Sequence, residues 1–90
     1  MAKIIIPTPL RKFTDNNTTL DVSGATVGES IGELVIAFPG LKQHLQDQGN
    51  KIRSYVNVFV GDENIRSLDN ENTAVAEDTI ISIVPAIAGG

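Results

Sequence analysis

The chain has 90 residues, a formal net charge of −4, 41% hydrophobic residues and no cysteine. This length suits a single domain with a small core, and the lack of cysteine excludes disulfides, thiol nucleophiles and cysteine-ligated metals. The negative charge argues against nucleic-acid binding, which depends on a basic face, and it is consistent with docking into a basic groove on a protein partner.

Two strands are predicted near the N-terminus. Residues 3–7 are apolar and β-branched up to Pro7, and residues 19–23 alternate apolar with polar side chains. Pro9 and the Asp15-Asn16-Asn17 cluster indicate a loop between them, so together they predict a β-hairpin. The apolar run before Pro7 is far too short for a signal sequence or a spanning helix. We therefore expect a cytoplasmic protein without membrane contact.

A helix is predicted to begin at Thr26, because Thr26-Val-Gly-Glu29 has the pattern of a capping box. Apolar residues follow at helical spacing: Val27, Ile31, Leu34, Val35 and Phe38. Pro39-Gly40 ends the helix, and residues 41–48 are predicted to form a short second one, closed by Gly49.

Two glycines stand inside this helix. Each costs about 1 kcal/mol relative to alanine, so we expect Gly28 and Gly32 both to be closely packed. Ile36 lies opposite the apolar stripe and either finds a neighbour or stays exposed.

The C-terminal half is predicted to hold three strands. Residues 55–60 form the clearest one, with Val56, Val58 and Val60 on one face and Phe59 on the other. A turn over 61–64 leads to a short strand at Ile65-Arg66, and 69–72 reads as a polar loop. Residues 79–84 make the last strand, which Pro85 ends because proline donates no backbone hydrogen bond.

These elements predict an α+β domain of two layers, in which a mixed sheet of four to five strands packs on one main helix. Residues 1–85 form the domain and 86–90 a free tail. If the valines of 55–60, Ile81 and Ile83 face the helix, the opposite face of the sheet exposes an apolar group beside the root of the tail. That group is predicted to bind partners and consists of Phe59, Ile80 and Val84.

The tail ends in two glycines, which form a narrow, unhindered strip of backbone. Such a strip can enter a tight channel and present the carboxylate of Gly90 to the catalytic groups of another enzyme. The carboxylate becomes reactive only after activation, for example as an acyl-adenylate. Gly90 is therefore the predicted site of chemistry, and the residues predicted to contact the partner are Ala86, Ile87, Ala88 and Gly89.

The remaining polar residues do not suggest an independent enzyme. His44 is the one histidine and is expected at a polar position on a short helix, without a metal site. The carboxylates of the predicted turns are expected to be solvated: Asp62, Glu63, Glu77 and Asp78. The cations Arg11, Lys12, Arg53 and Arg66 are expected to be ordinary surface residues.

The chain resembles the MoaD/ThiS-type sulfur carriers, which have the β-grasp, or ubiquitin-like, fold. The resemblance covers nearly the whole chain and rests on Ile6 to Arg11, Val56 to Val60, Asp62 to Arg66, and the ending Ser82-Ile-Val-Pro-Ala-Ile-Ala-Gly-Gly90. The Val-Asn-Val-Phe-Val segment and the Ala-Ile-Ala-Gly-Gly ending look nearer to the cysteine-synthesis carrier than to the thiamine carrier. One departure is Ala76-Glu77-Asp78, where the family usually has Asp-Gly-Asp.

The resemblance implies a carrier rather than an enzyme. An E1-like enzyme, using ATP, would adenylate the Gly90 carboxylate, and a sulfur donor would displace AMP to leave a thiocarboxylate. The sulfur would pass to an acceptor on a synthase, either the large subunit of molybdopterin synthase or a PLP-dependent synthase. The chain itself would bind no cofactor.

Two other functions use the same sequence features. A ubiquitin-like modifier would be activated in the same way and joined through Gly90 to lysines of target proteins. A plain binding domain would have a tail without function, and removal of Gly89 and Gly90 would leave its binding intact.

Overall fold

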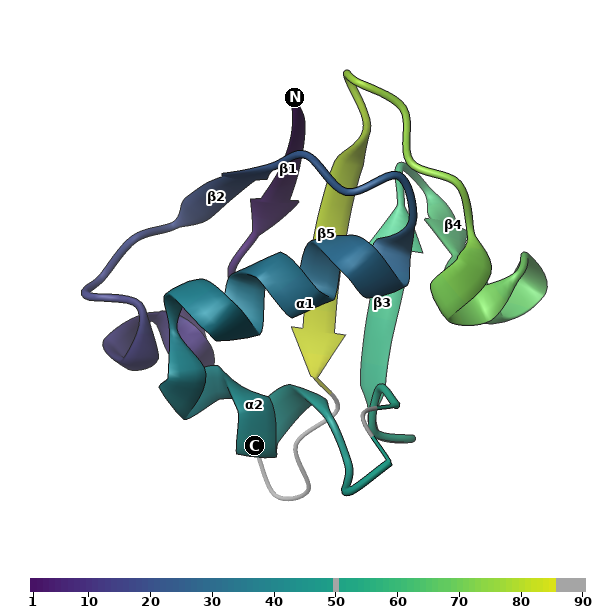
Figure 1. The fold of residues 1–90 in the computed structure, drawn as a ribbon. Coiled ribbons are helices and arrows are strands. Elements are labelled where there is room, and N and C mark those ends of the chain that lie inside the picture. Colours follow the sequence, from purple (N-terminus) through teal and green to yellow (C-terminus); the bar gives the residue numbers. More distant parts are fainter. Residues whose placement is uncertain (50, 86–90) are drawn as a thin grey trace.

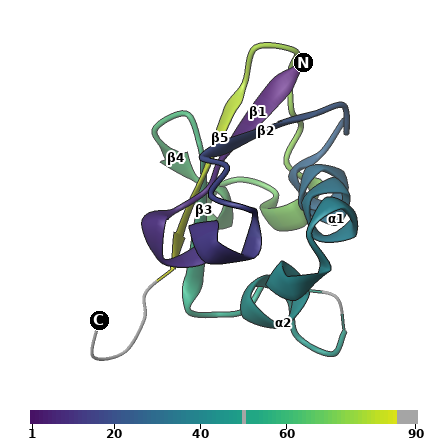
Figure 2. The same ribbon diagram turned by 90° about the vertical axis from the view of Figure 1, so that its left-hand side faces the viewer.

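The computed structural model describes residues 1–49 and 51–85, which form a five-stranded sheet with a helical layer on one face (Figure 1). The strand order is β2-β1-β5-β3-β4. The strands are β1 (Ala2–Ile5), β2 (Thr19–Val22), β3 (Val56–Val60), β4 (Glu63–Asn64) and β5 (Ile80–Pro85). The helices are α1 (Val27–Ala37) and the single turn α2 (Lys42–Leu45). Figure 2 shows α1 and α2 on the same side of the sheet.

The sheet is mixed, as predicted. β1 and β2 form the expected antiparallel hairpin, with Ile4 opposite Leu20. β5 lies between the other long strands, parallel to β1 and antiparallel to β3. The first and last strands of the described chain are thus neighbours at the centre of the sheet.

Helix α1 begins as the capping pattern predicts. The Thr26 side chain accepts a hydrogen bond from the Glu29 amide at 3.2 Å, whereas the Glu29 carboxylate reaches one residue further back than in a standard box and accepts from the Ala25 amide at 3.0 Å. The predicted stripe faces the sheet: Val27, Ile31 and Leu34 are buried, and Val35 and Phe38 pack at the edge of the core. Ile36 lies on the opposite side and is 80% exposed.

The two helix glycines differ. A β-carbon on Gly28 would lie 3.1 Å from the Glu71 carbonyl oxygen, so the prediction of close packing is confirmed there. A β-carbon on Gly32 would meet no atom within 4 Å, so the same prediction is wrong for Gly32.

Short elements account for most of the differences from the predicted structure. The loop after β1 is a 3-10 helix, Thr8–Phe13, and the second helix is limited to α2 after the 3-10 turn Pro39–Leu41. The prediction of a strand at Ile65-Arg66 is wrong, because these residues form a 3-10 turn. Gly61 has φ +61°, which allows a tight turn directly after β3, so the returning strand already forms at Glu63–Asn64.

The ends of β4 and β5 also differ from the predicted ones. The Asn64 side chain accepts from the Arg66 amide at 2.9 Å and caps the 3-10 turn Ile65–Ser67, which ends β4. β5 includes Pro85, which lies in register with Val56, so the ladder runs one residue beyond the predicted stop at Val84.

The core lies between the sheet and the helical layer. The predicted inward residues of β3 and β5 fill it: Val56, Val58, Ile81 and Ile83 are at most 4% exposed, and Val60 packs at its margin. β1 adds Ala2 and Ile4, and Leu41 and Leu45 close the end below α1. This choice of inward face decides which side chains the sheet presents outward.

Candidate functional site

The predicted site of chemistry, Gly90, lies outside the described residues, as do Ala86, Ile87, Ala88 and Gly89. The structure does describe the root of this segment. Pro85 is the last residue of β5, and it is held beside Val56 of β3. The root of the tail therefore belongs to the central strand of the sheet, which pairs with β1 on one side and β3 on the other.

The sheet face turned away from α1, called here the open face, carries the predicted apolar group. Ile80 is 41% and Val84 48% exposed, and Phe59 is half-buried. The alternative assignment, with these residues in the core, is thereby excluded. Val84 lies next to Pro85, at the end of β5 from which the tail continues, whereas Phe59 of the neighbouring strand β3 pairs with Ser82 in the middle of β5 and Ile80 begins the strand.

A fourth residue extends this group, and the sequence analysis did not single it out. Ile5 is 38% exposed, and both Ile5 and Phe59 lie in register with Ser82, one on each side of β5. Because Ile4 and Ile6 are buried, the two-residue period of a strand turns Ile5 outward. We call Ile5, Phe59, Ile80 and Val84 the apolar strip.

A fixed polar group borders the apolar strip. The Arg66 guanidinium donates to the carbonyl oxygens of Ser54 (2.6 Å) and Val56 (3.2 Å) and to Asn57 Oδ1 (3.0 Å). The same Asn57 oxygen accepts from the Asn64 side chain at 3.3 Å. Arg66, expected to be an ordinary surface residue, instead anchors the start of β3 beside the root of the tail.

Several acidic side chains have structural partners. Glu33 accepts from the amide and hydroxyl of Ser23, and Asp47 accepts from the amides of Gly49 and Lys51. The carboxylates predicted in turns are exposed, as expected: Asp62, Glu63, Glu77 and Asp78. Within residues 1–49 and 51–85 no three His, Asp or Glu side chains are grouped so that they could hold a metal ion.

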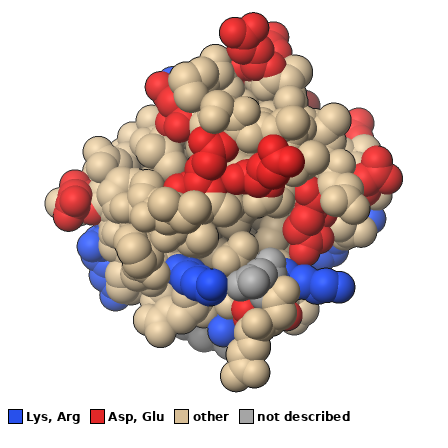
Figure 3. All heavy atoms as spheres, viewed as in Figure 1, with Lys and Arg blue, Asp and Glu red and all other residues tan. Residues whose placement is uncertain are grey.

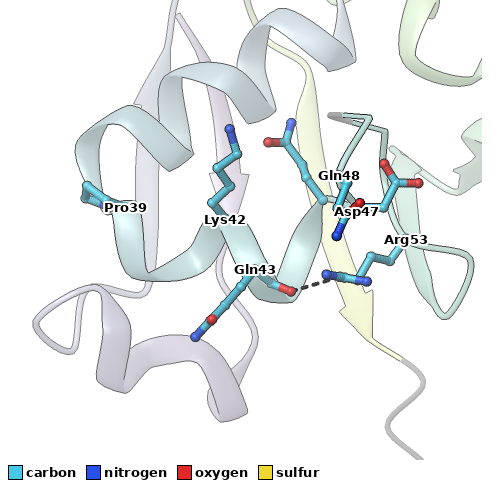
Figure 4. Close-up of a pocket in the computed structure, with 7 residues that line it drawn as sticks. Pro39, Lys42, Gln43, Asp47, Gln48 and Arg53 are labelled. Carbon is cyan, nitrogen blue, oxygen red and sulfur yellow. Dashed lines mark hydrogen bonds between the residues drawn. The ribbon is translucent and has the colours of Figure 1, made fainter.

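The hollows of the surface are shallow. One of them, with a volume of about 310 Å³, lies between α2 and the loop that leads to β3. Figure 4 shows residues that line it, among them Arg53, whose side chain donates to the Gln43 carbonyl oxygen at 2.8 Å. The His44 ring on α2 stacks against Phe13 with 4.5 Å between ring centroids, and its buried Nε2 has no hydrogen-bond partner in the described part of the chain. His44 therefore serves packing. In the same part of the chain, no helix has the length and apolar character needed to cross a membrane.

The comparison with known families settles the class of protein. The sequence model of the ThiS family matches residues 4–90. The chain belongs to the ThiS family. Sulfur carrier protein CysO of Mycobacterium tuberculosis is 35% identical over 89 residues, which cover 97% of this chain and 96% of that protein. Small archaeal modifier protein 3 of Haloferax volcanii is 32% identical over 66 residues, covering 73% and 71%.

Solved structures agree. A chain of the BexX/CysO complex of Amycolatopsis orientalis matches at a TM-score of 0.91 and 32% identity, over 100% of both chains. Mycobacterium tuberculosis CysO matches at 0.87 and 31% identity, over 97% of this chain and 100% of that one. The β-grasp fold and the likeness to MoaD/ThiS-type sulfur carriers are confirmed. The predicted likeness to the cysteine-synthesis carrier agrees with the CysO relatives, of which the Mycobacterium tuberculosis protein is named a sulfur carrier.

Proposed function

We propose that this chain is a cytoplasmic sulfur carrier whose Gly90 carboxylate is activated and then converted to a thiocarboxylate. The observation that carries the proposal is the relation to sulfur carrier protein CysO, which extends over nearly the full length of both chains. A carrier of this kind needs a stable domain, a narrow terminal segment and a surface for docking, and the sequence and fold offer features suited to each.

The chemistry has two steps. A carboxylate oxygen of Gly90 attacks the α-phosphorus of ATP on an E1-like enzyme, and pyrophosphate leaves. Sulfide (HS⁻) from a sulfur donor then attacks the acyl carbon, AMP leaves with that oxygen, and loss of the sulfur-bound proton leaves the thiocarboxylate. ATP is bound and consumed by the activating partner, and this chain holds no cofactor.

The tail suits the first step by its reach. Five residues follow Pro85, and a fully extended chain spans about 3.3–3.6 Å per residue, or roughly 17 Å in total. That length allows Gly90 to enter an active site while the folded domain stays at its entrance. Gly89 keeps the strip of backbone narrow next to the reacting group.

The apolar strip is proposed to dock the domain on its partners. Its apolar side chains extend along β5 and its two neighbours and reach the root of the tail at Val84, so a partner that accepts the tail also meets this surface. Exposed apolar groups of this kind commonly mark interaction sites. The activating enzyme and the sulfur-accepting synthase are both candidates for this contact.

The acceptor is proposed to be a PLP-dependent synthase of cysteine formation, since the full-length relatives are named CysO. The large subunit of molybdopterin synthase is the second candidate, from the resemblance to the MoaD/ThiS type as a whole. Incubating the thiocarboxylated chain with each synthase and its acceptor substrate distinguishes them by which one consumes the thiocarboxylate, first as a thioester between the carrier and the acceptor and then, after water breaks the bond between the acyl carbon and sulfur, as the carboxylate.

Intact-protein mass spectrometry tests the central proposal. After incubation with ATP, an E1-like enzyme and a sulfur donor, the mass should rise by the difference between one sulfur and one oxygen atom. A chain lacking Gly90 should not change, although it should melt at the same temperature, because the described core is built from residues 2 to 83. An unchanged mass of the full chain under all conditions would contradict the proposal.

A modifier function is the alternative that a specific observation favours, namely the relation to small archaeal modifier protein 3. In that case Gly90 would form an isopeptide bond with lysines of other proteins. Tryptic digests of cell proteins would then contain lysines carrying the C-terminal residues of this chain, and deletion of Gly90 would remove them.

A further inference from the structure

The positive charges of the chain are gathered at one end of the domain. Of its seven Lys and Arg residues, only Lys3 lies elsewhere. The others lie at the end of the domain where β1 and β5 finish and β3 begins. They belong to the 3-10 helix after β1, to α2, to the loop before β3 and to the turn Ile65–Ser67, from which the Arg66 side chain reaches Ser54. We call this group the basic end: Arg11, Lys12, Lys42, Lys51, Arg53 and Arg66.

Direct contacts join these segments into one surface. The Phe13 ring, next to Lys12, stacks on His44 of α2. The neighbouring α2 residue Gln43 accepts from Arg53, and Arg66 donates to Ser54 in the same loop. The basic end therefore runs from one side of the root of the tail, beneath α2, to the other side.

The rest of the molecule is strongly acidic. Three carboxylates border the basic end, Asp15, Asp47 and Glu71, the last through its hydrogen bond from the Ile52 amide. Eight others, Asp21, Glu29, Glu33, Asp62, Glu63, Asp69, Glu77 and Asp78, lie away from it, where the positive groups are the Lys3 side chain and the amino group of Met1. Figure 3 shows this division on the helical side, with Asp and Glu over and above α1 and with Lys and Arg below it.

The structural contacts of the arginines leave their charge in place. Arg11 donates to the Ile6 carbonyl oxygen at 3.2 Å and Arg53 to the Gln43 carbonyl oxygen at 2.8 Å, and the three acceptors of Arg66 are also neutral. Lys12, Lys42 and Lys51 are exposed. A partner that approaches the root of the tail therefore meets a positive surface, although the chain as a whole carries −4.

We propose that the E1-like enzyme that receives and adenylates the tail carries a rim of Asp and Glu side chains around the opening that the tail enters. The inference rests on the proposed function, because it assumes that the tail is inserted into a partner. Net charge alone suggested a basic groove. The arrangement of the charges reverses that expectation for the end of the molecule from which the tail continues.

The physical advantage lies in orientation as well as attraction. An acidic rim attracts the basic end and repels the acidic remainder, so long-range forces turn the tail toward the opening before contact. Exposed charges at an interface act chiefly on the association rate, and they lose this effect when salt shortens the Debye length from about 10 Å at 0.1 M to about 3 Å at 1 M.

The arrangement of charges favours a protein partner over a nucleic acid. The basic end is bordered by carboxylates, and the Arg66 guanidinium already donates hydrogen bonds to three acceptors within the chain. Nucleic-acid binding relies on many cations that neutralise phosphates over an extended basic face. The basic end instead lies on both sides of the root of a segment suited to insertion into a protein.

Two variants of equal net charge test the inference. Lys12→Gln/Lys51→Gln removes two positive charges from the basic end, and Ala25→Glu/Ala76→Glu adds two negative charges at exposed positions of the opposite end, so both change −4 to −6. Association of each full-length chain with the E1-like adenylating enzyme of the same organism is measured by biolayer interferometry at about 50 mM and about 500 mM NaCl, and adenylation is followed by pyrophosphate exchange.

At low salt the basic-end variant should associate with the enzyme about three- to tenfold more slowly than wild type. The control variant should keep or exceed the wild-type association rate. At high salt the three association rates should converge. Equal rates for the two variants, with wild-type adenylation intact, would overturn the acidic rim and leave the proposed function standing. Failure of every chain, wild type included, to be adenylated would overturn both. Tighter binding of wild type to a DNA duplex of about 20 base pairs than to the enzyme would assign the basic end to nucleic acid and overturn the inference.

Discussion

The guanidinium of Arg66 lies 2.6 Å from the carbonyl oxygen of Ser54 and so ties the turn after β4 to the residues that precede β3. Two further bonds, to Val56 and Asn57, complete a three-point attachment. Val56 is also the residue beside Pro85. A side chain on the surface thus stabilises the strand end that holds the root of the tail.

We predict that Arg66→Ala lowers the free energy of unfolding by about 1–2 kcal/mol, because hydrogen bonds from a charged donor are lost and the Val56 carbonyl keeps no replacement. Arg66→Lys should restore only part of this, since an ammonium group cannot span three acceptors as the planar guanidinium does. Urea denaturation measures each change. Arg11→Ala, which removes a single bond to Ile6, is the control and should cost less; equal losses would contradict the attachment.

The width of the tail gives the second prediction. Gly89→Val should abolish adenylation of Gly90, because a β-branched side chain widens and stiffens the strip that enters the channel. Its melting temperature should equal that of wild type, and Gly89→Ala, with a smaller side chain, should retain part of the activity. Pyrophosphate exchange with the activating enzyme provides the rates. A normal rate for the valine variant would show that the channel is wider than the tail requires.

The open face gives the third prediction. Phe59→Asp should weaken binding to the activating enzyme or to the acceptor synthase by about 1–3 kcal/mol if Phe59 is an anchor of the apolar strip, while the domain still folds because the ring is only half-buried. Ile36→Asp is the matched control, since Ile36 is 80% exposed on the helical side. Isothermal titration calorimetry measures both. Equal affinities of the two variants would place docking elsewhere.

The helix glycines give the fourth prediction. Gly32→Ala should raise the free energy of unfolding by about 0.5–1 kcal/mol, because alanine favours the helix and its methyl group meets open space. Gly28→Ala should gain less or lose stability, because its methyl group would press on the Glu71 carbonyl oxygen at 3.1 Å. Thermal melts of the two variants decide the order, and a larger gain for Gly28→Ala would contradict it.

The sequence predicts those parts of the fold that depend on periodicity. The alternation of Val56 to Val60 and the spacing of Val27, Ile31 and Leu34 assign the inward faces of β3 and α1, and these assignments place Phe59, Ile80 and Val84 outside the core. The same rule identifies Ile5, although the continuous run of three isoleucines hides its alternation.

Local hydrogen bonding accounts for what periodicity misses. The side chain of Asn64 turns the chain into a 3-10 helix where Ile65 and Arg66 resemble a strand. The partners of Arg66 lie 9 to 12 residues away in sequence, so its role follows only from the fold. Gly28 and Gly32 are alike in the sequence, and only the position of Glu71 distinguishes them.

The pairing of β1 with β5 has a consequence for how the protein is made. The first strand must wait for residues 80–85 before it gains its parallel neighbour, and β3, on the far side of β5, waits for the same segment. On the ribosome the sheet therefore remains open until residues 80–85 have left the exit tunnel, and contacts of such long sequence separation form slowly. A nascent chain that stops before residue 80 cannot close its sheet and is exposed to proteolysis.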